Sequence, residues 1–186
     1  MTGKFPSITL SLVIAASAAA LCSPRAAVAA SATAIDSKST AALTQLYDTE
    51  TGTRELASKA KAILIFPSIV KAGFIFGGQY GEGALREGDR TVGYYNTVAA
   101  SYGLQAGGQT FGYVMFLMTD SALSYLKNSK GWEIGVGPSI VIVEAGKAKS
   151  LTTTTLKDDV YAFIFDQKGL MAGLGIQGSK ITRIHR

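Results

Sequence analysis

The sequence predicts an α+β fold dominated by a strongly curved, glycine-rich, mainly antiparallel, barrel-like sheet. Residues 31–62 are rich in Ala, Ser, Thr and charge, whereas the pattern from residue 62 onward is that of strands. The chain holds 21 glycines, many inside these strand patterns, where each needs a reason such as a bulge, tight curvature or a close backbone approach. Strands do not alternate with long helices, so a parallel βαβ arrangement is excluded.

The first 29 residues contain the three parts of an export signal. Lys4 precedes an apolar run over residues 8–21, and residues 27–29 offer an Ala-x-Ala cleavage site. The run has 14 residues, whereas spanning a bilayer takes about 20, so a cleaved signal is favoured over a retained membrane anchor. We therefore predict a signal peptide over 1–29 and a single domain over 30–186.

Cys22, the single cysteine, lies at the end of this apolar run. The position suits a lipidated cysteine of a bacterial lipoprotein, although Leu21 stands where a small residue is expected. Cleavage after Ala29 would instead leave a mature chain without cysteine, and hence without disulfides or thiol catalysis. Both processing sites remain open. In either case we expect the periplasm, or the periplasmic face of the bacterial envelope.

Helices are expected between about 35 and 61, interrupted at Gly52, with Ile35, Leu43, Leu46 and Tyr47 roughly on one face of the first. A short helix over 121–127, capped by Thr119 or Asp120, is expected in mid-domain. Pro67 should end the first strand, and a strand pair should run from Trp132 to Val143. The expected strands cover 62–66, 73–80, 83–87, 92–95, 97–109, 113–118, 132–136, 140–143, 160–165, 170–176 and 181–184.

The charge is only mildly basic. Removal of residues 1–29 takes away Lys4 and Arg25 and no acidic residue, so the formal charge falls from +5 to +3. This excess is too small to predict nucleic-acid binding, but it is compatible with attraction to an anionic membrane surface.

Residues suited to catalysis are few. The single histidine, His185, is the penultimate residue, and Asp158 and Asp159 are adjacent, which suits a solvated turn. The spacing of Glu82, Glu87 and Glu144 does not predict that they meet. A G-x-G-x-x-G pattern over 173–178 lacks the following helix that a dinucleotide site needs. We predict no enzyme, no cofactor and no metal site.

Basic residues are expected to gather where the second helix meets the first strands: Arg54, Lys59, Lys61 and Lys71. Beside them the N-terminal helices carry a weak apolar stripe. Such a helix can lie among lipid headgroups, or its stripe can pack on the protein's own sheet with the charges simply solvated. On the pattern alone, packing on the sheet is favoured.

Several motifs in register resemble those of the SYLF domain family. The segment AKAILIFPSIVKAGFIFGGQYGEG over 60–83 is similar to the family's opening motif. YGLQAG over 102–107, GVGP over 135–138 and KGLMAGLGIQGS over 168–179 resemble later ones, so the likeness covers about 35–184. One departure is the stretch 93–98, which lacks the family's usual tryptophan and proline.

The resemblance implies a non-catalytic protein that binds anionic phospholipid or a phosphoinositide-like headgroup at the bacterial envelope. The alternative is a structural or protein-binding module of the envelope without lipid specificity. The implied lipid contacts are the N-terminal helix, with Lys38, and the basic residues around the opening motif: Arg54, Lys59, Lys61 and Lys71. For Lys71, a stem that merely covers the core is an equal alternative. Some relatives bind actin, but export makes actin an unexpected native partner here.

Overall fold

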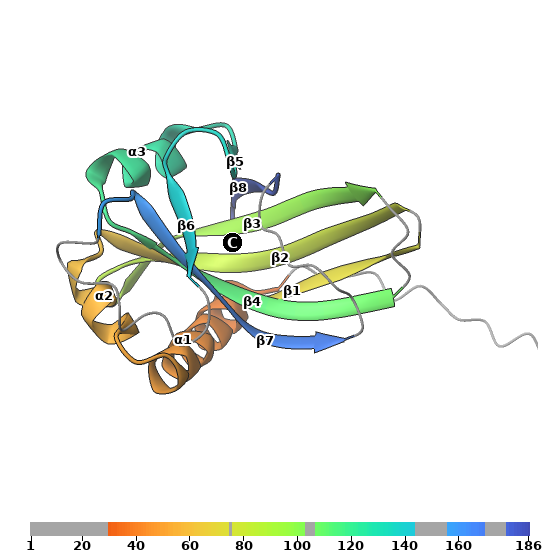
Figure 1. Ribbon diagram of the computed structural model, residues 1–186, viewed down its shortest axis with the longest axis horizontal. Coiled ribbons are helices and arrows are strands. Elements are labelled where there is room, and N and C mark those ends of the chain that lie inside the picture. Colours follow the sequence, from red (N-terminus) through yellow and green to blue (C-terminus); the bar gives the residue numbers. More distant parts are fainter. Residues whose placement is uncertain (1–29, 75, 103–106, 144–155, 170–177) are drawn as a thin grey trace, which may run out of the picture.

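The computed structural model describes residues 30–186 except 75, 103–106, 144–155 and 170–177. Within these residues, three helices accompany an eight-stranded sheet that curls into a half-barrel (Figure 1). The helices are α1 (Ala32–Thr49), α2 (Thr53–Lys59) and α3 (Asp120–Asn128). The strands are β1 (Ala62–Phe74), β2 (Phe76–Glu87), β3 (Arg90–Tyr102), β4 (Gly107–Leu117), β5 (Trp132–Glu133), β6 (Ile140–Val143), β7 (Val160–Gly169) and β8 (Lys180–Ile184).

The strands lie in the order β5-β8-β3-β2-β1-β4-β7-β6. Neighbours are antiparallel except β6 and β7, which are parallel. The predicted class, an α+β protein built on a curved and mainly antiparallel sheet, is confirmed.

Local capping signals set the helix boundaries. The Ser31 side chain accepts a hydrogen bond from the Ala34 amide, and the Thr119 side chain accepts one from the Ala122 amide. Between α1 and α2, Gly52 has a φ of 100°, a left-handed conformation that favours glycine. Two N-terminal helices divided at Gly52, and a mid-domain helix capped by Thr119, are therefore confirmed.

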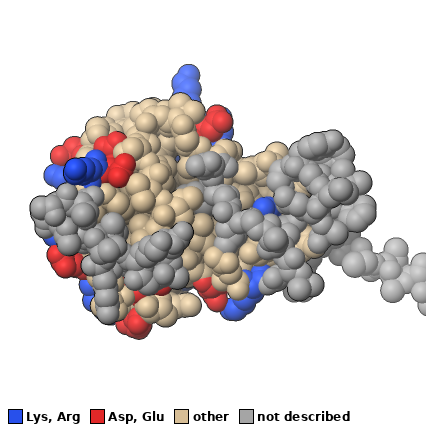
Figure 2. All heavy atoms as spheres, viewed as in Figure 1, with Lys and Arg blue, Asp and Glu red and all other residues tan. Residues whose placement is uncertain are grey.

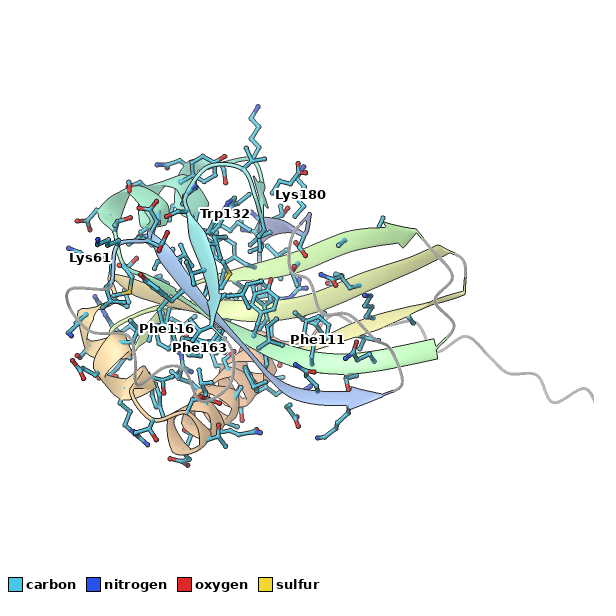
Figure 3. The ribbon with its side chains drawn as sticks, in the orientation of Figure 1. Lys61, Phe111, Phe116, Trp132, Phe163 and Lys180 are labelled. Atoms are coloured by element: carbon cyan, nitrogen blue, oxygen red, sulfur yellow. The ribbon has the colours of Figure 1, made fainter. Side chains whose placement is uncertain are left out.

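The alternating side chains of the central strands enter two hydrophobic cores. On the concave face, Leu64, Phe66 and Phe111 pack with Trp132 and the inner side of α3. On the convex face, Ile63, Ile65, Phe116 and Phe163 pack against α1 and α2 (Figure 3). Both faces of the sheet are thus occupied at the end of the molecule that carries the helices.

Pro67 does not end the first strand, contrary to the prediction. β1 continues to Phe74, and its register with both neighbours shifts between Ile65 and Ile69. This bulge accommodates a residue that has no N–H to donate within a central strand. The expected strand over 73–80 is in fact the meeting of β1 and β2, because Gly73 pairs with Gly77 across the hairpin.

Two further expectations were wrong. Trp132 and Val143 do not belong to one strand pair, because β5 pairs with β8 whereas β6 pairs with β7. The strand expected from 97 is the second half of β3, and β4 begins only at Gly107. The strand expected over 170–176 lies outside the described residues.

The far halves of β1, β2, β3 and β4, with the end of β7, run well beyond the three helices (Figure 1). We call this part the arm. It comprises residues 68–74, 76–82, 97–102, 107–111 and 165–169. None of the three helices covers its convex face, and Val70, Tyr80 and Val98 are about half exposed there.

The predicted signal peptide and Cys22 lie outside the described residues. Among the helices that are described, none combines the length and hydropathy needed to cross a bilayer.

Candidate functional site

The structure separates the basic residues that the sequence suggested as one cluster. Arg54 and Lys59 lie on α2, and Lys61 immediately precedes β1. Lys71 stands ten positions farther along that strand, about 33 Å away in an extended chain. Lys38 lies on α1 and is exposed. The expected gathering therefore holds for Arg54, Lys59 and Lys61 alone.

Each of these three cations is paired with an acid at the surface. Arg54 bonds to Asp48 at 3.0 Å, Lys59 to Glu55 at 2.7 Å, and Lys61 to Asp120 at 3.1 Å. Basic and acidic side chains accordingly adjoin over the helix-bearing end (Figure 2). Exposed pairs contribute at most about 1 kcal/mol each, so a phosphate could displace the acids, but it would compete with a carboxylate at each of the three cations.

A cleft of about 450 Å³ opens beside these residues. Its lining includes Tyr47, Arg54, Ser58 and Asp89, with small apolar residues from α2 and β1. Arg54 lies over the Tyr47 ring, 4.8 Å from the ring centre. Burial raises the pKa of the Tyr47 hydroxyl, which remains neutral. With Asp89 in its lining and Asp48 on Arg54, the cleft does not favour an anion.

The apolar stripe of α1 packs on the sheet. Ile35, Ala42, Leu43 and Leu46 are buried, and the last three belong to the convex-face core. Asp36 anchors the helix by accepting hydrogen bonds from Thr91 and Tyr94, each at 2.8 Å. Of the two alternatives for this stripe, packing on the protein's own sheet is the one that the structure shows.

Lys71 points into the concave side of the sheet. It follows Ile69 at a spacing of two, so both side chains share the core face. Its direct partners in the sheet are Gln79 on β2 and Gln109 on β4. The exposed fractions of Lys71, Gln79 and Gln109 are 9%, 6% and 6%. We call these three residues the inner row. They are nearly buried on the concave side of the sheet, so Lys71 is not a surface cation.

The side-chain amide of Gln79 donates a hydrogen bond to the Ser179 hydroxyl at 2.7 Å. This bond connects the inner row to the residue that immediately precedes β8. The Gln109 carbonyl oxygen is buried without a hydrogen-bond partner. Among the five basic candidates Lys71 is the least exposed, which favours the view that its stem covers the core.

The convex face of the arm carries a row of exposed apolar side chains. Val70 pairs with Tyr80, and Tyr80 pairs with Val98, so these three side chains stand side by side across β1, β2 and β3. Their exposed fractions are 54%, 48% and 45%. Half-exposed apolar side chains are ordinary when isolated, but three in one line form a patch.

The same line of register partners continues to a lysine at each end. Val98 pairs with Lys180 on β8; on the other side Val70 pairs with Thr110, and Thr110 with Lys168 on β7. Both lysines are exposed. We call these six residues the outer row: Lys180, Val98, Tyr80, Val70, Thr110 and Lys168. Figure 3 labels Lys180 on β8, well away from Lys61 at the helix-bearing end.

Charged groups next to the outer row are largely paired among themselves. Lys168 bonds to Asp166 at 2.9 Å, and Glu133 on β5 stands opposite Lys180. Glu82 accepts a hydrogen bond from the Tyr80 hydroxyl at 2.6 Å and also pairs with Arg186. Burial by itself would raise the pKa of Glu82, but the Tyr80 and Arg186 bonds and the Arg186 charge lower it overall.

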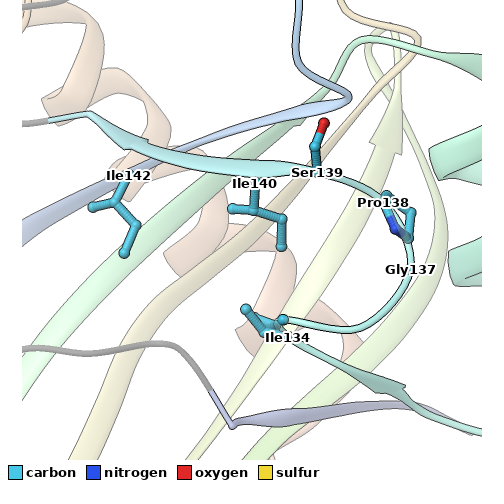
Figure 4. Close-up of a pocket in the computed structure, with 7 residues that line it drawn as sticks. Ile134, Gly137, Pro138, Ser139, Ile140 and Ile142 are labelled. Atoms are coloured by element: carbon cyan, nitrogen blue, oxygen red, sulfur yellow. The ribbon is translucent and has the colours of Figure 1, made fainter.

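A small pocket of about 180 Å³ lies between β6 and the turn that precedes it (Figure 4). Ile134, Ile140 and Ile142 line it with Pro138, and Ser139 supplies the hydroxyl. Within the described part of the chain, the lining includes no ionisable side chain that could take part in acid–base chemistry.

The carboxylates considered for catalysis have structural partners. Glu82 is held as described above, and Glu87 pairs with Lys127. Asp159 accepts hydrogen bonds from the Thr119 hydroxyl at 2.8 Å and the Ser139 amide at 3.0 Å, which lower its pKa. Glu144 lies outside the described residues. Across the described part of the chain, no group of three or more His, Cys, Asp or Glu side chains is arranged to hold a metal ion.

The sequence analysis did not predict the outer row, because its members come from different strands and are brought together only by the register of the strand pairs. The bulge at Pro67 turns Ile69 inward and Val70 outward, and the local pattern of residues 68–72 does not reveal that phase. Lys168 and Lys180 are far from Val70 in the sequence and join it through three different strand pairings.

Residues 98–185 match a family model, Ysc84, which is described as Las17-binding protein actin regulator. The matched part runs from the end of β3 through β8 and so includes Val98, Lys168 and Lys180. A search of curated proteins gave no match to the chain.

Proposed function

We propose that this protein, whose residues 98–185 match the Ysc84 (SYLF) family model, binds anionic phospholipid at a membrane surface and catalyses no reaction. The family is known for binding lipids and actin-related partners, and it is not known as an enzyme family. We further propose that the protein acts at the bacterial cell envelope, as its predicted export signal indicates.

The observation that carries the proposal is the outer row. It combines exposed apolar side chains with a cation at either end, which is the composition that suits a headgroup layer. Aromatic and aliphatic groups enter the interface between headgroups and acyl chains, while lysines pair with phosphate. The Lys168–Asp166 pair is exposed, so it costs little to exchange the carboxylate for a lipid phosphate.

The expected affinity can be worked out from the exposures. Full burial of a large apolar side chain contributes about 1.5–3 kcal/mol, so the half-exposed Val70, Tyr80 and Val98 contribute about 1 kcal/mol each. Two lysines near an anionic surface add about 1 kcal/mol each. The sum, about 5 kcal/mol, is comparable with one myristoyl chain, so binding by this surface is weak and reversible.

The test is flotation of the purified protein with vesicles of phosphatidylcholine containing phosphatidylglycerol. We expect Val70→Ser/Tyr80→Ser/Val98→Ser to bind about 100-fold more weakly, because about 3 kcal/mol is lost. Lys168→Glu/Lys180→Glu should lose at least about 30-fold. Val136→Ser, which removes an equally exposed apolar residue outside the row, is the matched control.

A second comparison separates the outer row from the residues first suggested by sequence. Lys59→Glu/Lys61→Glu and Lys38→Glu carry the same kind of charge change elsewhere on the surface. If either of these abolished binding while the outer-row variants bound normally, lipid contact would belong to the helix-bearing end. If no variant or native protein bound anionic vesicles, the alternative of a protein-binding envelope module would be favoured.

A further inference from the structure

We infer that the outer row recognises the charge of a bilayer surface and not the stereochemistry of a single headgroup. This inference rests on the proposed function and specifies its ligand: an anionic bilayer of any headgroup. It follows from three features of the row, namely the separation of its cations, the apolar side chains between them, and its open shape.

The two lysines are too far apart to hold one phosphate. Lys180 and Lys168 lie on strands separated by four others in the sheet order. Five strand spacings of about 4.8 Å place their backbones about 24 Å apart along the sheet. A site for one headgroup requires donors that converge on the same few oxygens, as bidentate and clustered phosphate contacts do. These lysines therefore meet different lipid molecules.

The space between the lysines is occupied by apolar side chains. Val98, Tyr80 and Val70 stand there on neighbouring strands, and each exposes about half of its surface. A soluble phosphate ester offers no apolar surface to cover them, whereas a bilayer provides both an apolar interior and a charged boundary. The outer row therefore has a lysine at each end and apolar side chains between them, an arrangement that matches the extended surface of a bilayer.

Among the described residues, the row also contributes to none of the pockets considered above. None of its six residues lines the 180 Å³ pocket beside β6 or the 450 Å³ cleft beside α2. Lys71, the nearest other cation along β1, points to the opposite face of the sheet and is nearly buried. Small-ligand recognition usually depends on a pocket with a few converging polar groups, and the described side chains of the outer row do not converge in this way.

The experiment compares vesicles that have equal surface charge but different headgroups. Phosphatidylglycerol, phosphatidylserine, cardiolipin and a phosphoinositide are each mixed with phosphatidylcholine so that the zeta potentials agree. The native protein should bind all four within about threefold, since the dominant attraction depends on surface potential. Added inositol trisphosphate or glycerophosphate, at a matched ionic strength, should displace no bound protein.

Each outcome is decisive. A preference of about tenfold or more for one headgroup at equal zeta potential would overturn the inference, as would displacement by a soluble headgroup. In either case the proposed function would stand, because lipid binding itself would remain. If all four anionic vesicles failed to bind, both the inference and the proposed function would be refuted. Lys168→Gln/Lys180→Gln should weaken binding to all four lipids by the same factor.

Discussion

Replacing Gly83 with alanine would test the physical reason for the glycines of β2. A Cβ atom at this position would lie 2.2 Å from the Ile65 carbonyl oxygen and 2.8 Å from Cδ1 of Phe66. The nearest atom belongs to the backbone, so it cannot move aside as a flexible side chain would. Gly83 stands where β1 bulges at Pro67, and the two strands approach each other closely there.

The magnitude follows from the cost of overpacking. One added methyl in a well-packed interior costs about 1–3 kcal/mol, and a clash with backbone belongs at or above the upper end of that range. For a protein of this size, 1 kcal/mol corresponds to about 2–4 °C, so Gly83→Ala should lower the melting temperature by about 6–12 °C.

Gly78→Ala is the matched control for this measurement. Its Cβ would meet only the Ala99 carbonyl oxygen at 3.6 Å, an ordinary contact. Loss of chain entropy in the unfolded state should make this change neutral or stabilising by up to about 1 kcal/mol. Thermal unfolding followed by circular dichroism distinguishes the two variants. Equal melting temperatures for both would refute the close approach of β2 to the bulge.

Other predictions concern the polar contacts that hold the elements together. Asp159→Asn should cost about 1–2 kcal/mol by weakening the hydrogen bonds from Thr119 and Ser139, measurable by urea unfolding; an unchanged midpoint would contradict this. The pKa values of Glu82 and Asp159 are lowered in the fold, so their stabilisation is complete above about pH 5 and is lost as the pH falls through the lowered values. The melting temperature should therefore fall below about pH 4.5, and less steeply in Glu82→Gln; identical slopes would count against the Glu82 contribution. Trp132→Ala should cost about 3–5 kcal/mol, because the indole is fully buried in the concave core, and a loss below about 1 kcal/mol would contradict that packing.

The helices and the overall class could be predicted because their signals are local. The left-handed Gly52, the Thr119 cap and the inward-facing leucines of α1 each depend on residues within a few positions of one another. Glycine richness likewise predicts curvature without any knowledge of which strands pair. These inferences hold whatever the tertiary arrangement, which is why they were confirmed.

The bulge and the surface charges could not be predicted in the same way. The local sequence around Pro67 is typical of a strand end. In the structure β1 continues past Pro67, because it pairs with β2 on one side and with β4 on the other. Lys61 was predicted as a lipid contact, but Asp120, nearly sixty positions away in the sequence, pairs with it in the fold. The strand pairing at Pro67 and the Lys61–Asp120 pair both depend on residues that are distant in the sequence. For this reason the sequence suggested a site at the helices, whereas the structure favours one on the arm.

The nearly buried carboxylate of Glu82 joins the two ends of the described chain. Its side chain is only 10% exposed and pairs with Arg186, and the Ala30 backbone lies close enough to help lower the pKa of Glu82. The polypeptide therefore enters and leaves the fold at neighbouring points, both beside Tyr80. A fusion partner or purification tag attached at either position would lie next to the outer row and could mask it. The exposed β2–β3 turn at Gly88 and Asp89, at the opposite end of those strands, is a better place for a fluorophore or an immobilising label.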